Sequence, residues 1–246
     1  MLIKNENQIK YMRISGHILS KIIKELVKYT KVGITTQQID LKAQELMKKY
    51  KVISAFKNFN GYPAVTCISI NEEIVHGLPS NKVIKDGDVV SIDCGVKYKG
   101  YCSDSAITFT IGEVSDKIKK LVKVTRKSLD ESIKLIRPGI KIGDIQARIQ
   151  SEIENNNLGL VRELTGHGIG KFLQEEPQIP NYGRLNTGIT LKPGMTFCLE
   201  PMVTLGNGKI KIKNDGWTIT SQDNTIAAHF EHTINVTKNG YEILTK

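Results

Sequence analysis

The sequence lacks the features of secreted and membrane-embedded proteins. It holds only 4 cysteines and no CxxC pair, so free, buried thiols in a reducing compartment are expected rather than a disulfide framework. No apolar run approaches the length of a membrane span, and the first seven residues contain no apolar signal core. These absences predict a cytoplasmic protein without a membrane partner.

No segment rich in proline, glycine or serine divides the chain, and no low-complexity tract is present. We therefore expect one domain over residues 1–246. No exposed heptad or repeated apolar face suggests self-association, so a monomer is expected.

Acidic residues are in the minority, 25 against 35 lysines and arginines, which gives a formal net charge of +10. Such an excess can mark a nucleic-acid or ribosome partner. The lysines, however, are spread along helical faces such as residues 117–134 instead of forming a run. A solvated, lysine-rich surface is favoured over a specific nucleic-acid partner, and a transient ribosome contact stays open.

An internal echo runs through the chain. Residues 32–39 resemble residues 138–145 at an offset of 106, and residues 85–93 resemble residues 192–200 at an offset of 107. Two echoes at nearly one offset predict two related halves, about 1–112 and 113–246, instead of a short-period solenoid. They also place Asp93 and Glu200 at equivalent strand ends that face a shared centre.

Hydrophobic periodicity predicts helices over residues 5–29, 116–136 and 144–155, and a Thr35–Gln38 capping box opens another that runs to about Lys49. Strands are predicted over residues 64–70, 88–94, 101–111, 195–199, 209–213 and 226–236. This alternation in blocks is typical of an α+β fold with helices backing an antiparallel sheet.

Four carboxylates stand out, the first two of which, Asp93 and Asp104, flank a turn around residues 98–100. A hairpin that closes at Tyr98–Lys99 would place them directly opposite, with Cβ atoms about 5 Å apart. Like charges in that position destabilise a hairpin unless a cation lies between them. The alternative is a register slip that turns one aspartate to solvent.

His167 lies among three glycines, a pattern that predicts a loop where backbone approaches a ligand closely. Glu200 and Glu231 each end or interrupt an apolar strand, where a charge needs a partner, a metal ion or a basic side chain. One imidazole and four carboxylates form a hard site suited to Mn, Fe(II), Co or Zn. Four carboxylates are more than one cation needs, so two metal ions roughly 3.5–4 Å apart are indicated. Such a pair produces a hydroxide nucleophile near neutral pH, so the predicted reaction is a hydrolysis.

The order Asp93, Asp104, His167, Glu200, Glu231, each in its own motif, resembles the type I methionine aminopeptidases over nearly the whole chain. The resemblance extends to the motifs Gly61-Tyr62-Pro63, Cys67-Ile68-Ser69-Ile70-Asn71-Glu72, His76-Gly77, Glu175-Glu176-Pro177 and to Trp217. It implies the pita-bread fold of two pseudo-symmetric halves. It also implies removal of the N-terminal methionine from nascent proteins when the second residue is small.

The same resemblance implies roles for individual residues. The five side chains would bind two divalent metal ions, with Asp104 and Glu231 bridging them. Glu200 would act as general base for the attacking hydroxide. His76 would hydrogen-bond the substrate near the scissile amide and assist the leaving amine.

The methionine side chain needs an unbranched apolar slot, and the family's pocket wall matches Phe59, Tyr62, Cys67 and Trp217, with Phe56 beside them. Ordinary core packing is the alternative for these aromatics. At residue 174 the family commonly has a second histidine, whereas this chain has glutamine. Gln174 can donate a hydrogen bond to a substrate oxygen but cannot carry a proton, so weaker transition-state stabilisation is expected.

Two rival functions remain. An Xaa-Pro aminopeptidase-like hydrolase of the same fold usually carries an additional N-terminal domain, which this sequence does not show. A non-catalytic binding protein of the fold would have lost metal ligands, whereas all five are present here. His17 and His229 are interpreted as structural.

Overall fold

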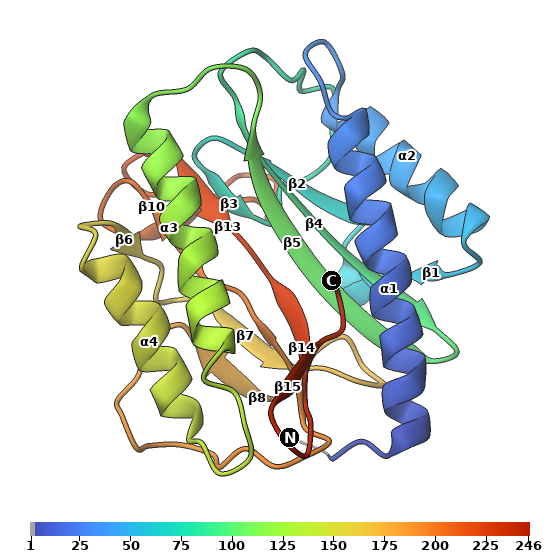
Figure 1. Cartoon of the computed structure of the whole chain (residues 1–246). Helices are drawn as coiled ribbons and strands as arrows, with labels where there is room; N and C mark the ends of the chain where they lie inside the picture. The colour runs from blue at the N-terminus through green and yellow to red at the C-terminus, as the bar shows by residue number, and fades with distance from the viewer. Residues whose placement is uncertain (1–2) are drawn as a thin grey trace.

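Helices cover the outer side of a curved set of antiparallel sheets (Figure 1). The computed structural model describes residues 3–246; Met1 and Leu2, which begin the N-terminal segment considered above, lie outside the described residues. The helices are α1 Glu6–Tyr29, α2 Thr36–Lys49, α3 Asp116–Ile133 and α4 Ile142–Glu154, with a 3-10 turn, η1, at Phe59–Gly61. The predicted α+β class is confirmed.

The strands are short apart from one long hairpin. In the N-terminal part they are β1 Ile53–Ser54, β2 Thr66–Ile70, β3 Glu73–Val75, β4 Val89–Tyr98 and β5 Tyr101–Thr110. They are followed by β6 Gly159–Leu160, β7 Thr165–Gly168, β8 Glu175–Pro180, β9 Thr196–Leu199, β10 Met202–Thr204, β11 Ile210–Ile212, β12 Ile219–Ser221, β13 Ala227–His229, β14 His232–Val236 and β15 Tyr241–Ile243.

The helix ends follow their capping residues. Asn5 and Gln8 form a capping box at the start of α1, and Thr35 and Gln38 form the predicted one at the start of α2. The predicted helix over 116–136 ends three residues early, at Ile133, ahead of Pro138. A proline disfavours the helical conformation in the residue before it, so the chain leaves the helix before that point.

The β4–β5 hairpin differs from the predicted register. Lys99 and Gly100 form the turn with φ of 46° and 85°, the two positive values of a type I′ turn. Asp93 pairs with Ala106 and Asp104 pairs with Gly95, so the two aspartates are diagonal neighbours and not directly opposite. A shift of two residues preserves the face, because side chains alternate with a period of two.

Three further expectations are wrong in detail. Asp93 lies in the middle of β4 and not at its end, whereas Glu200 directly follows β9. His167 lies in strand β7 and not in a loop. The predicted strand 226–236 is two strands, β13 and β14, separated by Phe230 and Glu231.

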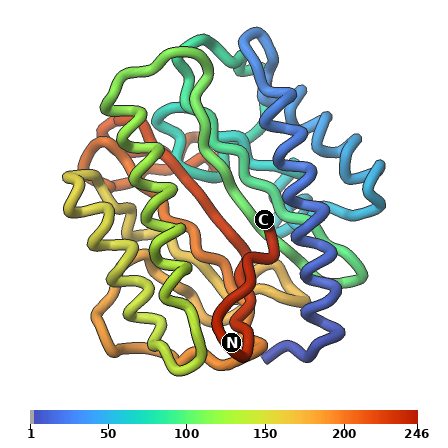
Figure 2. Tube along the Cα trace, viewed as in Figure 1, coloured from blue at the N-terminus to red at the C-terminus, as the bar shows by residue number. Residues whose placement is uncertain are grey.

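The sheets of the two parts of the chain meet along β5. The backbone of Glu231 exchanges hydrogen bonds with that of Ala106, and the Thr233 hydroxyl accepts from Asp104 N and donates to Asp104 O. The C-terminal segment then returns to α1 (Figure 2), where Arg13 pairs with Glu242. There a Cβ on Gly16 would lie 2.2 Å from Leu244 O, so only glycine allows this contact.

Corresponding backbone contacts recur at the offset of the sequence echo. The isolated bridge Thr35–Val83 corresponds to Lys141–Thr190, at offsets of 106 and 107. Gly33 donates to Ile84 O as Gly139 donates to Leu191 O, and both glycines have φ of 90°. We propose that the chain is one domain of two related halves, as the echo suggests.

Each pair of helices covers its own apolar core. One core lies beneath α1 and α2 and includes Leu19, Ile22, Ile39, Ile68 and Ile92; a second, beneath α3, includes Leu129, Ile133, Phe197 and Ile234. All four cysteines are free and buried, as predicted. Within residues 3–246 no helix has the length and apolar character that crossing a membrane requires.

Candidate metal centre and substrate pocket

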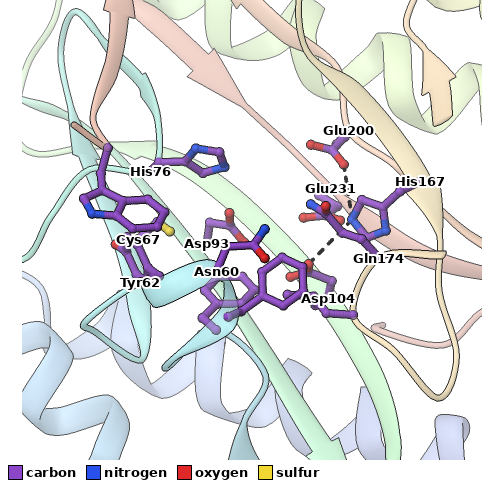
Figure 3. A pocket seen from close by; sticks show the side chains of 14 residues that line it. Asn60, Tyr62, Cys67, His76, Asp93, Asp104, His167, Gln174, Glu200 and Glu231 are labelled. Atoms are coloured by element: carbon purple, nitrogen blue, oxygen red, sulfur yellow. Dashed lines mark ion pairs between the residues drawn. The ribbon is translucent and has the colours of Figure 1, made fainter. Parts of the chain in front are cut away.

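The eleven side chains singled out in the sequence line one cavity of about 200 Å³ (Figure 3). The structure therefore brings together residues from four strands (β2, β4, β5 and β7), from η1 and from loops between strands. The set comprises Phe59, Tyr62, Cys67, His76, Asp93, Asp104, His167, Gln174, Glu200, Trp217 and Glu231. Phe56 lies there too.

The carboxylates converge because of strand register. Asp93 and Asp104 share one face of β4–β5, and Ala106, the partner of Asp93, is hydrogen-bonded to the backbone of Glu231. Oxygen atoms of Asp93, Asp104 and Glu231 all lie within 4.8 Å of one another. Three acids, from β4, from β5 and from the break between β13 and β14, therefore face one point.

Glu200 and Glu231 interrupt two paired strands at the same place. On one side of the break His232 pairs with Leu199, and on the other His229 pairs with Met202. The register is the same on both sides, which places the two glutamates opposite each other at the gap. There they have left the regular ladder and their side chains reach the cavity.

The electrostatics of these acids are unfavourable without a cation. Burial is the main cause that raises the pKa of all four carboxyls, and the charges of the neighbouring acids raise those of Asp93, Glu200 and Glu231 further. The pKa of Asp104 rises to about 7. One buried oxygen on each of Asp93, Asp104 and Glu231 has no hydrogen-bond partner among the described residues.

His167 adds a neutral imidazole to this group of acids. Its Nδ1 lies 2.9 Å from Gly168 O, which assigns the proton to Nδ1 and leaves Nε2 with a free lone pair. That Nε2 lies 3.6 Å from Glu200 Oε1 and 3.9 Å from Asp104 Oδ2. Burial lowers the pKa of His167 and so favours the neutral ring.

The glycines around His167 allow close packing between strands, and not the predicted approach of a loop to a ligand. A Cβ on Gly166 would lie 2.4 Å from Cys198 O, and one on Gly168 would lie 2.6 Å from Glu176 O. The glycines therefore allow β7 to pack closely between β9 and β8, with His167 projecting into the cavity.

The donor set fits divalent metal ions. Unpartnered carboxylate oxygens and one free imidazole nitrogen are ligands that Mn, Fe(II), Co and Zn accept. Cys198 Sγ also lies within 4.8 Å of His167 and Glu231 ligand atoms. However, this thiol contacts the Thr233 hydroxyl at 3.5 Å and does not line the cavity, and burial raises its pKa well above 9.0. We therefore do not count it as a ligand.

Apolar and aromatic side chains form the part of the cavity wall next to the acids. Tyr62 and Trp217 meet edge to face with ring centroids 5.2 Å apart. The Tyr62 hydroxyl donates to Thr66 O and Gly77 O, which fixes the ring. Cys67 pairs with Asp93 across β2–β4, so this wall and the acids are neighbours on one sheet.

His76 and Gln174 lie on either side of the acids (Figure 3). His76 has φ of 56°, an uncommon backbone conformation for a residue other than glycine. Burial lowers its pKa, so the ring is neutral at pH 7. Gln174 precedes Glu175, whose carboxylate forms a buried ion pair with Lys4 at 2.6 Å.

The sequence reasoning missed two residues that line the cavity and interpreted a third residue near the site, His229, as structural. Asn60 and Leu173 line the cavity; the sequence signal was their position beside Phe59 and Gln174. His229 lies just behind Glu200, with Nε2 3.9 Å from Glu200 Oε2. Burial and the nearby His76 lower the pKa of His229 to about 3.

Comparison with known proteins gives consistent similarities. The model of metallopeptidase family M24 matches residues 10–238. Methionine aminopeptidase 1 of Bacillus subtilis is 44% identical over 246 residues, covering 100% of this chain and 99% of the relative. Methionine aminopeptidase of Escherichia coli is 39% identical and covers 99% and 93%.

Solved structures agree. The crystal structure of methionine aminopeptidase from Thermotoga maritima has a TM-score of 0.98 and 44% identity, covering 100% of this chain and 99% of that one. The prolidase from Pyrococcus furiosus has a TM-score of 0.80 at 23% identity and covers 99% and 65%. The second likeness is one of fold alone.

Proposed function

The chain belongs to metallopeptidase family M24 and is a methionine aminopeptidase, and we propose that the cavity described above is its active site. Its relatives of known structure have the pita-bread fold, so the fold prediction is confirmed. One observation carries the proposal: five metal-ligand side chains and an aromatic wall line the same cavity.

Asp93, Asp104, His167, Glu200 and Glu231 are the side chains that would hold two divalent ions, and Asp104 and Glu231 are the two that could contact both. The three unpartnered carboxylate oxygens and the free Nε2 of His167 support this set. The metal is Co, Mn, Fe(II) or Zn. When bound, such ions act as Lewis acids and generate a nucleophile near neutral pH.

The protein's own groups hold and move the protons. The Glu200 carboxylate takes up the proton that the attacking water releases. The neutral His76 imidazole hydrogen-bonds the scissile amide beside the leaving amine. The side-chain amide of Gln174 donates to a substrate oxygen from the other side of the acids.

The apolar wall receives the methionine side chain. Tyr62, Trp217, Phe59 and Cys67 offer aromatic and sulfur contacts to a thioether. The cavity has a volume of about 200 Å³, and we propose that the peptides it accepts have a small second residue. The substrates are therefore the N-terminal Met peptides of nascent chains.

The setting of the enzyme is part of the same proposal. Four free, buried thiols fit a reducing compartment, so we place the chain in the cytoplasm. We also propose that it acts as a monomer. Its net charge of +10 supports a transient ribosome contact.

The test is release of free methionine from Met-Ala-Ser and Met-Leu-Ser by metal-free protein titrated with Mn, Fe(II), Co and Zn. We expect metal-dependent cleavage of the first peptide and little of the second. Folded protein that binds metal but releases no methionine would overturn the proposal and favour a non-catalytic binding role.

A further inference from the structure

A second buried histidine, which the roles above do not use, lies behind the active site. His229, at the end of β13, is only 1% exposed. Neither of its ring nitrogens has a hydrogen-bond partner among the described residues. Buried polar groups are nearly always hydrogen-bonded, so an unsatisfied one requires a structural reason.

The backbone of His229 is held firmly. Its N–H donates to Thr108 Oγ1 at 2.8 Å, and its carbonyl accepts from the same hydroxyl at 2.7 Å. Thr108 Oγ1 also lies 2.7 Å from Ser91 Oγ on β4. His229 is therefore attached to the hairpin that carries Asp93 and Asp104, and its ring has a defined position.

The ring faces the carboxylate of Glu200. His229 Nε2 lies 3.9 Å from Glu200 Oε2, while Glu200 Oε1 lies 3.6 Å from His167 Nε2. The two oxygens of one carboxylate are thus directed at two imidazoles. Because His229 pairs with Met202, two residues after Glu200, the contact follows from the β10–β13 register.

The two imidazoles offer different chemistry to Glu200. His167 has its proton on Nδ1 and presents a lone pair, so it cannot donate a hydrogen bond to Glu200. A neutral His229 carries its one ring proton on either Nδ1 or Nε2. Glu200 Oε2 is the acceptor near Nε2, which favours the proton on Nε2. Closing the gap to a normal hydrogen bond needs a movement of about 1 Å.

We propose that His229 is a positioning residue for Glu200: its Nε2–H donates to Oε2 and thereby turns Oε1 toward His167 and the cavity. The hydrogen bond restricts carboxylate rotation and leaves one oxygen to act at the metal centre, as outer partners of metal ligands do. The inference rests on the proposed role of Glu200.

The first test uses Zn-loaded protein, in which Glu200 is ionised, and needs no activity. Long-range ¹H–¹⁵N spectra of histidine-labelled protein report the tautomer of each of the 5 histidines, and the His229→Gln variant assigns the His229 signals by their loss. We expect the Nε2–H tautomer with a downfield, hydrogen-bonded proton. An Nδ1–H tautomer would overturn the proposal.

The second test compares His229→Gln, which retains an N–H donor, with His229→Leu, which has none. We expect His229→Leu to lower kcat and metal affinity about 10-fold to 100-fold with little change in KM. His229→Gln should retain most of both. A matched control is His232→Gln, since the partly buried His232 already contacts Thr245 Oγ1 through Nδ1 and does not line the cavity.

Equal losses in His229→Gln and His229→Leu would indicate packing alone and overturn the proposal, as would native kcat and metal affinity in His229→Leu. If His229→Leu does not fold, the spectra of the native protein still decide. Failure of the unmodified enzyme to release methionine would instead overturn the proposed function, so the two failures are distinguishable.

Discussion

Asp93 and Asp104 are diagonal neighbours on one face of the β4–β5 hairpin, because Asp93 pairs with Ala106 and Asp104 with Gly95. This offset of two residues avoids a direct like-charge pair across the strands and still directs both carboxylates into the cavity. The backbone bonds from Ala106 to Glu231 then bring a third acid alongside. The site built on this geometry has measurable consequences for stability, catalysis and substrate binding.

The metal-free protein should lose stability as pH rises. Burial raises the pKa of Asp104 to about 7 in the folded state, against 3.8 as its ordinary value. The folded state therefore holds this proton more tightly than the unfolded chain, and stability falls between about pH 4 and pH 7. The raised pKa values of Asp93, Glu200 and Glu231 act with the same sign.

Thermal unfolding of metal-free protein from pH 5.5 to 8 measures this effect, which should be several degrees in Tm. Asp104→Asn, which resembles the protonated acid, should flatten the profile and exceed the native Tm at pH 8 while weakening metal binding. A flat native profile, or a parallel one for the variant, would contradict the charge argument.

His76→Asn should lower kcat roughly 10²-fold or more, since it removes the group that we propose to lie beside the leaving amine. Asparagine accepts the positive φ of 56° at this position, so the variant should fold. Metal affinity, measured by calorimetry on metal-free protein, should not change. His17→Asn, on the exposed side of α1, is the control; an equal loss in both variants would exclude a specific role.

Gln174→His should raise kcat/KM for Met-Ala-Ser about tenfold, the effect of about 1.4 kcal/mol. An imidazolium donates a stronger, charge-assisted hydrogen bond to a developing oxyanion than an amide does. Gln174 lines the cavity, so the replacement reaches the same space. Steady-state kinetics decide, and no gain, or a loss, would show that glutamine is not the weaker residue here.

Trp217→Ala should raise KM for methionyl peptides about tenfold by removing part of the apolar wall. The ring packs edge-on against Tyr62 and is only partly buried, so the change in Tm should be small. Phe172→Ala is a matched control, because Phe172 is 63% exposed and does not line the cavity. An unchanged KM for Trp217→Ala would place the methionine side chain elsewhere.

Much of the architecture was predictable because it depends on local signals. The Thr35–Gln38 capping box and the apolar periodicity of α1 specify helices through neighbouring residues alone. Short strands such as β3, β6 and β10 were missed, since three residues or fewer carry no period. They exist because longer-range partners supply their hydrogen bonds.

The sequence by itself determined which ionisable side chains enter the cavity, because acids and an imidazole inside apolar or glycine-rich strands need a compensating partner when they are buried. Tertiary structure alone decided three things: the two-residue offset of Asp93 and Asp104, the strand around His167, and the approach of His229 to Glu200. The turn at Lys99 and Gly100 sets the first, the pairing of β7 with β8 and β9 sets the second, and the pairing of β10 with β13 sets the third. The last two depend on contacts between residues far apart in the chain, which no local pattern encodes.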